Sequence, residues 1–114
     1  MNFPPADTFE ISAAETDALR KAGVPFLLID CREQDEWNLC HIHGAELVPL
    51  SVFAEQSRVR FTNPEERLVI HCHHGMRSAQ AAHFLRQRGI PLAWSMAGGI
   101  EAWSQDVDPS VPTY

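Results

Sequence analysis

A short segment around Cys72 combines the residue types needed for nucleophilic sulfur chemistry. Cys72 follows the apolar run 68–70 and His71, and it precedes a helix-like run over residues 79–88. A thiol placed where a strand ends and a turn begins can be surrounded by backbone N–H groups, and the positive end of the next helix adds to them. Such surroundings stabilise a thiolate and lower the pKa of a cysteine from about 8.5 to about 3.5–7.5. The pattern predicts that Cys72 is a nucleophile.

The neighbours of Cys72 decide between this interpretation and the alternative of a small, buried core residue, which free cysteines often are. Gly75 permits an unusual backbone angle, Arg77 supplies a fixed cation, and Ser78 can cap the following helix. These residues favour a catalytic role over a purely structural one.

Composition sets the broad class of the protein. The chain has 114 residues with a net charge of -6, which predicts one domain over residues 1–114 and disfavours nucleic acid or acidic membranes as partners. No apolar run is long enough to cross a bilayer, and residues 1–8 lack the features of a secretory signal, so a cytoplasmic location is expected. Three cysteines at irregular spacing predict reduced thiols, with structural roles for Cys31 and Cys40.

Short apolar runs alternate with helix-like segments along the chain. Ser12 and Glu15 form a capping-box pattern, and Ser51 is the expected cap of a later helix. The expected strands are 9–11, 26–30, 46–50, 67–71 and 92–95, and the expected helices are 12–22, 33–39, 51–57, 78–88 and 100–104.

This alternation predicts an α/β fold with three layers, α/β/α, around a central, mostly parallel five-stranded sheet. Ligands of such sheets bind beyond the carboxyl ends of the strands, and Cys72 follows such an end. The segment at about 106–114 contains Pro109 and Pro112 and is expected to form an extended tail. The place of Cys72 in the predicted fold and the chemistry of its loop therefore both indicate a functional site at this residue.

Three segments resemble the single-domain rhodanese (thiosulfate sulfurtransferase) family. The loop from Cys72 to Arg77 has the family's spacing of four intervening residues. Residues 30–45 resemble the signature D-x-R-x-x-x-E-aromatic-x-x-G-H-I-x-G-A, and residues 96–103 resemble L-x-G-G-x-x-A-W. Cys40 stands where the family usually has glycine, so the turn before His41 is not predicted. The matches extend from about residue 26 to residue 103.

The resemblance implies a sulfurtransferase that moves a sulfane sulfur from a donor such as thiosulfate, through a Cys72 persulfide, to a thiol or cyanide acceptor. The implied partners are the small donor and acceptor and a sulfur-relay protein, and no cofactor is expected. The residues expected to bind substrate are His73, His74, Gly75, Met76 and Arg77, and those expected to support the loop are Asp30, Arg32, Glu36 and Ser78.

Some roles within the loop stay open. Arg77 can face the substrate anion or turn away and hold the loop, and the second role is favoured. His73 and His74 can offer positive charge near neutral pH or simply fill exposed positions.

Two other functions are compatible with this loop. A cysteine-loop phosphatase or arsenate reductase of the related type has five residues between cysteine and arginine, and the shorter loop here suits sulfur instead. A non-catalytic sulfur-carrier or metal-binding module could use the histidines and cysteines, but their spacing matches no closed zinc pattern, and adjacent His73 and His74 are not expected to point at one ion. No metal site is therefore predicted. The residues considered for the metal alternative are His41, His43, His71, His73, His74, Cys40 and Cys72.

Overall fold

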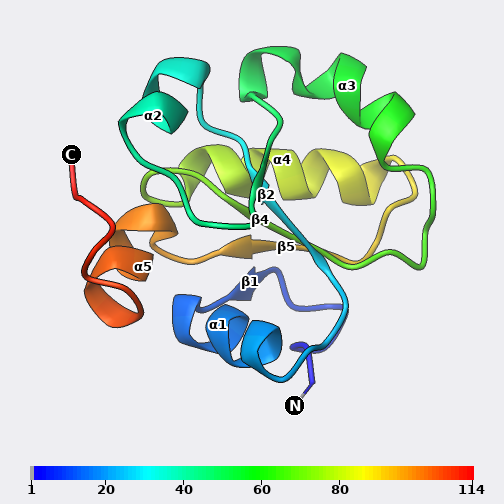
Figure 1. Ribbon diagram of the computed structural model, residues 1–114. Helices are drawn as coiled ribbons and strands as arrows, with labels where there is room; N and C mark the ends of the chain where they lie inside the picture. Colours follow the sequence, from blue (N-terminus) through cyan, green and yellow to red (C-terminus); the bar gives the residue numbers. More distant parts are fainter. Residues whose placement is uncertain (1) are drawn as a thin grey trace.

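A computed structural model describes residues 2–114, and strands alternate with helices along the chain (Figure 1). The strands are β1 (Glu10–Ile11), β2 (Leu27–Asp30), β3 (Glu46–Leu47), β4 (Leu68–His71) and β5 (Ala93–Met96). The helices are α1 (Ala13–Lys21), α2 (Gln34–Leu39), α3 (Phe53–Arg60), α4 (Met76–Gln87) and α5 (Gly99–Asp106), and a short 3₁₀ helix, η1 (Leu50–Val52), leads into α3.

The strands form one five-stranded sheet in the order β1-β5-β4-β2-β3, and every pairing is parallel. The predicted α/β fold with a parallel sheet is therefore confirmed. Strand β4 lies at the centre, between β5 and β2. Cys72 directly follows β4, so its thiol lies at the middle of the carboxyl edge of the sheet.

Alternate residues of the buried strands face opposite sides of the sheet and build two cores. Ile29 and Ile70 pack with α3 and α4 on one side, while Leu28 and Val69 pack with α1 and α5 on the other. Figure 1 shows this arrangement, with α3 and α4 above the sheet and α1 and α5 below it. Both faces are covered, as expected for strands that read as almost unbroken apolar runs.

The predicted capping box at the start of α1 is confirmed. The Glu15 backbone N–H donates to Ser12 Oγ at 3.0 Å, and the Ser12 N–H donates to Glu15 Oε1 at 2.9 Å. The two other cap predictions are wrong. Ser51 lies within η1 and donates its hydroxyl to Glu33 at 2.6 Å, so α3 begins without a side-chain cap.

Ser78 does not cap α4, because that helix begins at Met76, directly after Gly75. Ser78 lies in the first turn, and its hydroxyl lies 2.7 Å from Ser95 Oγ. The amino end of α4 faces the sulfur of Cys72 in place of a side-chain cap. The sequence pattern could not show this because it does not reveal where the loop folds back.

Other boundaries differ from prediction at the ends of elements. The strand expected at 46–50 is only two residues long, and α3 continues to Arg60. Helix α5 runs to Asp106, after which the tail turns at residues 108–110 and Ser104 Oγ donates to the Val111 carbonyl at 2.6 Å. The tail thereby returns to the carboxyl edge of the sheet. Among the described helices, none is both long and apolar enough to cross a membrane.

Candidate active site

The sulfur of Cys72 lies inside a ring of hydrogen-bond donors. The backbone N–H of Gly75 donates to Sγ at 3.1 Å and the N–H of Ser78 at 3.4 Å, and Ser78 Oγ lies 3.6 Å away. The Cys72 residue is 1% exposed. Backbone donors at the positive end of α4 favour an anion at this position. This agrees with the predicted nest of N–H groups around the thiol.

Two glycines shape the loop. Gly75 has a φ of 114°, a left-handed backbone that turns the chain into α4. Gly99 has a φ of 61°, and a Cβ atom there would lie 2.4 Å from the carbonyl oxygens of Cys72 and His73. Because the backbone of Gly99 lies so close to the loop, the Ile100 N–H can donate to the Cys72 carbonyl at 2.8 Å. The start of α5 therefore holds the loop by direct backbone contact.

We expect Gly99→Ala to destabilise the fold more than Gly23→Ala. Gly23 has a similar φ of 74° but nothing within 4 Å of an added Cβ, so it isolates the effect of backbone angle. The steric overlap at Gly99 should lower the free energy of unfolding by about 1–3 kcal/mol beyond the loss in the Gly23 variant. Urea unfolding of both variants measures this difference, and equal losses would show that the contact between α5 and the loop is not tight.

The thiol of Cys31 is a neighbour of Cys72 that the sequence did not predict. The proximity of the Cys31 thiol, followed by the Ser78 and Gly75 donors and opposed by burial, lowers the pKa of Cys72 to about 4. The same proximity, together with burial, raises the pKa of Cys31. Cys31 therefore remains a thiol while Cys72 is ionised. The available signal was its position, one residue beyond the strand that pairs with β4.

Arg77 forms a bidentate ion pair with Glu36 of α2. Its Nη1 bonds Glu36 Oε1, and its Nη2 donates to Oε2 at 2.9 Å. The pair lowers the pKa of Glu36 to about 2, helped by hydrogen bonds from Tyr114 and the Glu33 N–H. The geometry matches the favoured role for Arg77, in which the guanidinium ties the loop to α2.

Asp30 and Arg32 form a second pair that is fully buried. Arg32 Nη2 donates to Asp30 Oδ2 at 2.8 Å and to the Cys40 carbonyl at 2.7 Å. Cys40 itself has extended backbone, with a φ of -169°, so this turn does not need the glycine that the family usually has. Arg32 thus links the end of β2 to the segment before His41.

An aromatic stack covers one side of the loop. The ring centroid of His73 lies 3.9 Å from that of His74 and 4.0 Å from that of Tyr114. The Tyr114 hydroxyl accepts from Arg32 Nη1 at 2.9 Å and donates to Glu36 at 2.7 Å. The contribution of Tyr114 was not predicted, because only the fold of the tail brings it here.

The two adjacent histidines lie closer together than expected. His74 Nε2 is 2.9 Å from Glu101 Oε2, and possible ligand atoms of His73, His74 and Glu101 lie within 4.8 Å of one another. The stacked rings explain this proximity, and the pairing of His74 with Glu101 accounts for the orientation of its ring.

A cavity of about 360 Å³ lies at the loop, and Cys72 is one of its lining residues. Met76 is 79% exposed at its rim. The lining residues are Cys72, His73, His74, Met76, Arg77 and Gln80.

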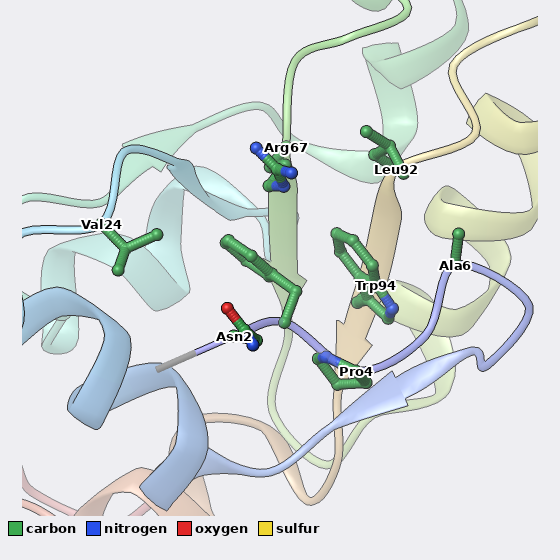
Figure 2. A pocket seen from close by; sticks show the side chains of 8 residues that line it. Asn2, Pro4, Ala6, Val24, Arg67, Leu92 and Trp94 are labelled. Carbon is green, nitrogen blue, oxygen red and sulfur yellow. The ribbon is translucent and has the colours of Figure 1, made fainter.

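A second cavity, of about 350 Å³, lies beside Arg67, Leu92 and Trp94 at the amino ends of β4 and β5 (Figure 2). It is therefore at the edge of the sheet opposite Cys72. Arg67 is the one charged group among the described residues that line it.

Comparison with known proteins gives consistent matches. The Rhodanese-like domain model matches residues 12–106. The chain is 31% identical over 113 residues to the adenylyltransferase and sulfurtransferase MOCS3-2 of Zea mays, covering 95% of this chain and 23% of that protein. It is 32% identical over 93 residues to the probable adenylyltransferase/sulfurtransferase MoeZ of Mycobacterium tuberculosis, covering 82% of this chain and 24% of that protein. The chain thus spans about a quarter of the length of these relatives.

Solved structures agree with these matches. A rhodanese-like domain protein from Staphylococcus aureus superposes with a TM-score of 0.77 at 25% identity, covering 94% of this chain and 99% of that one. The human single-domain sulfurtransferase TSTD1 superposes with a TM-score of 0.75 at 26% identity, covering 87% of this chain and 97% of that one. With its fold, its loop and these relatives, the chain belongs to the rhodanese-like domain family.

Proposed function

We propose that this protein is a sulfurtransferase that carries a sulfane sulfur on Cys72. The observation that carries the proposal is the Cys72 sulfur, which accepts hydrogen bonds from the Gly75 and Ser78 N–H groups in a residue that lines the cavity. These donors stabilise a thiolate, and they can equally stabilise the charge of a persulfide at the same place.

The reaction is a double displacement with a covalent intermediate. The Cys72 thiolate attacks the outer sulfur of a donor such as thiosulfate, the S–S bond of the donor breaks, and sulfite leaves with the electron pair. An acceptor thiolate or cyanide then attacks the outer sulfur of the persulfide and regenerates the Cys72 thiolate. No proton has to be removed from Cys72 near neutral pH, because its pKa is about 4.

The arrangement of charges supports an anionic donor. The protein carries a net charge of -6, so a dianion must be attracted locally. Two side chains that line the cavity, His73 and His74, can supply positive charge when protonated. Arg77 adds a fixed charge at the base of the loop although its hydrogen bonds go to Glu36.

A sulfur-relay protein is the proposed physiological partner class. The relatives from Zea mays and Mycobacterium tuberculosis are named for both adenylyltransferase and sulfurtransferase activity. This chain matches about a quarter of the length of each of those proteins. A small thiol or cyanide would then be a substitute acceptor in the test tube.

Steady-state kinetics with thiosulfate and cyanide test the proposal. Thiocyanate formation should show parallel-line, ping-pong behaviour, because sulfite leaves before the acceptor reacts. An aryl phosphate assayed in parallel is the control for the phosphatase alternative. Phosphate release without thiocyanate formation would reject sulfur transfer in favour of that alternative.

We expect the double change of His73 and His74 to glutamine to raise KM for thiosulfate, because both side chains line the cavity that the donor would enter. Glutamine cannot carry the positive charge that an imidazole can offer to a dianion. Cys72 is ionised in both proteins near neutral pH, because its pKa is about 4.

The matched control is His83→Gln, which changes an exposed histidine of α4 that does not line the cavity. Thiosulfate kinetics of both variants at fixed pH and ionic strength give the answer. An unchanged KM in the double variant would show that the two side chains do not attract the donor.

A further inference from the structure

Cys31 and Cys72 are neighbours across the centre of the sheet. Strands β2 and β4 are parallel, and Asp30 is paired with His71 at their carboxyl ends. The register continues one residue further, since the Cys31 N–H donates to the His71 carbonyl at 2.9 Å. Cys31 therefore lies opposite Cys72.

The two side chains also share one face of the sheet. Both cysteines belong to the core cluster that includes Ile29 and Ile70, which precede them by two residues on the same strands. Neighbouring strands lie about 4.7–4.9 Å apart. This spacing falls inside the Cα separation of about 4.4–6.8 Å that a disulfide requires. A bond between the two sulfurs thus needs no change in the order of the strands.

Access to the two thiols is unequal. Cys72 lines the cavity of about 360 Å³, whereas Cys31 is fully buried and is not among the described residues that line it. A small reagent entering the cavity meets the sulfur of Cys72 first. Cys31 does not meet such a reagent directly, so we expect it to react with Cys72 after Cys72 has been modified.

We propose that Cys31 and Cys72 form a reversible redox pair, in which a peroxide oxidises Cys72 and Cys31 then closes an intramolecular disulfide. In the first step the Cys72 thiolate attacks one peroxide oxygen, the O–O bond breaks, hydroxide leaves, and Cys72 becomes a sulfenic acid. In the second step the Cys31 sulfur attacks Cys72 Sγ and the S–O bond breaks. The departing hydroxide takes the Cys31 proton and leaves as water. An external thiol reopens the disulfide by exchange.

The electrostatics of the pair favour this order of events. While Cys72 is a thiolate, its proximity and charge, together with burial, raise the pKa of Cys31, so Cys31 is held as a thiol. Conversion of Cys72 to an uncharged sulfenic acid removes that charge, and Cys31 then ionises more readily. The resolving thiol is thus activated only after Cys72 has been oxidised. The disulfide prevents further oxidation of Cys72 to the irreversible sulfinic acid.

The test is peroxide treatment of the full chain without any sulfur donor. Hydrogen peroxide is added in small excess, the protein is unfolded in an alkylating reagent, and peptides are mapped by mass. We expect wild type to lose two alkylatable thiols and to yield a cross-linked peptide that joins Cys31 to Cys72, and dithiothreitol should restore both thiols. A cyclic sulfenamide would instead leave Cys31 free to alkylate, so mapping separates the two products.

Cys31→Ser keeps a hydrogen-bond donor but removes the sulfur, and Cys40→Ala is the matched control. The serine variant should accumulate sulfinic acid on Cys72 that dithiothreitol does not reverse, whereas the Cys40 variant should behave like wild type. If the serine variant does not fold, Cys31→Ala replaces it, and the wild-type peptide map decides independently. Sulfinic acid on wild-type Cys72 without a Cys31 cross-link would overturn the proposal. Because no donor or acceptor is present, that result would leave the proposed sulfur transfer untouched.

Discussion

Replacing Cys72 by serine should abolish thiocyanate formation from thiosulfate, with a loss of at least about 1,000-fold, or about 4 kcal/mol in barrier. The hydroxyl occupies nearly the same volume, but it is not ionised near neutral pH and does not accept a sulfane sulfur. The fold should remain intact, because the buried core around Cys72 is preserved. Turnover together with circular dichroism separates the loss of chemistry from the loss of structure.

Cys40→Ser is the matched control for this substitution. Cys40 is a half-buried free cysteine whose Sγ lies 3.5 Å from the Pro112 carbonyl, and it does not line the cavity at Cys72. It should retain nearly full activity. Thiosulfate turnover retained in Cys72→Ser would remove Cys72 from the mechanism.

The second large effect concerns the pH dependence of Cys72 alkylation. With a pKa of about 4, Cys72 should react with iodoacetamide at nearly the same rate at all pH values between about 6 and 9. An ordinary thiol with a pKa of about 8.5 would be about 300-fold less ionised at pH 6 than at full ionisation. Peptide mapping confines the measurement to Cys72. A rate that rises tenfold per pH unit up to about pH 8 would show that the loop does not stabilise a thiolate.

Cys31→Ala separates the two sources of that stabilisation. It removes the neighbouring thiol, the largest single cause of the lowered pKa of Cys72, but leaves the Gly75 and Ser78 donors in place. The midpoint of the alkylation profile should therefore move to higher pH and stay below about 8.5. An unchanged midpoint would show that the backbone donors alone hold the thiolate.

Most of the strands and helices could be predicted from local patterns in the sequence. Apolar runs ending at Asp30 and His71 predicted two central strands, and the Ser12 capping box predicted the start of α1. The position of Cys72 at the carboxyl edge followed from the alternation of strands and helices. These features depend on neighbours in the chain, so the sequence contains them directly.

Features that depend on distant parts of the chain could not be predicted in the same way. Ser51 and Ser78 have the chemistry of caps, but Ser51 bonds Glu33 and Ser78 contacts Ser95. Tyr114 reaches the loop only because the tail turns after α5. These contacts depend on tertiary packing.

The pairing of Cys31 with Cys72 required the strand register. The sequence places each cysteine after a strand, but only the parallel pairing of β2 with β4 puts them opposite each other. A shift of one residue would have turned Cys31 to the other face of the sheet. For this reason the sequence alone predicted a structural role for Cys31.

The mass of the intact chain after exposure to thiosulfate tests the central claim most directly. Protein is incubated with thiosulfate without acceptor, passed through a desalting column and weighed under non-reducing conditions. The proposed mechanism predicts a gain of one sulfur atom, located on Cys72, removed by cyanide and absent from Cys72→Ser. No gain in wild type, or the same gain in Cys72→Ser, would contradict the proposal that Cys72 carries the transferred sulfur.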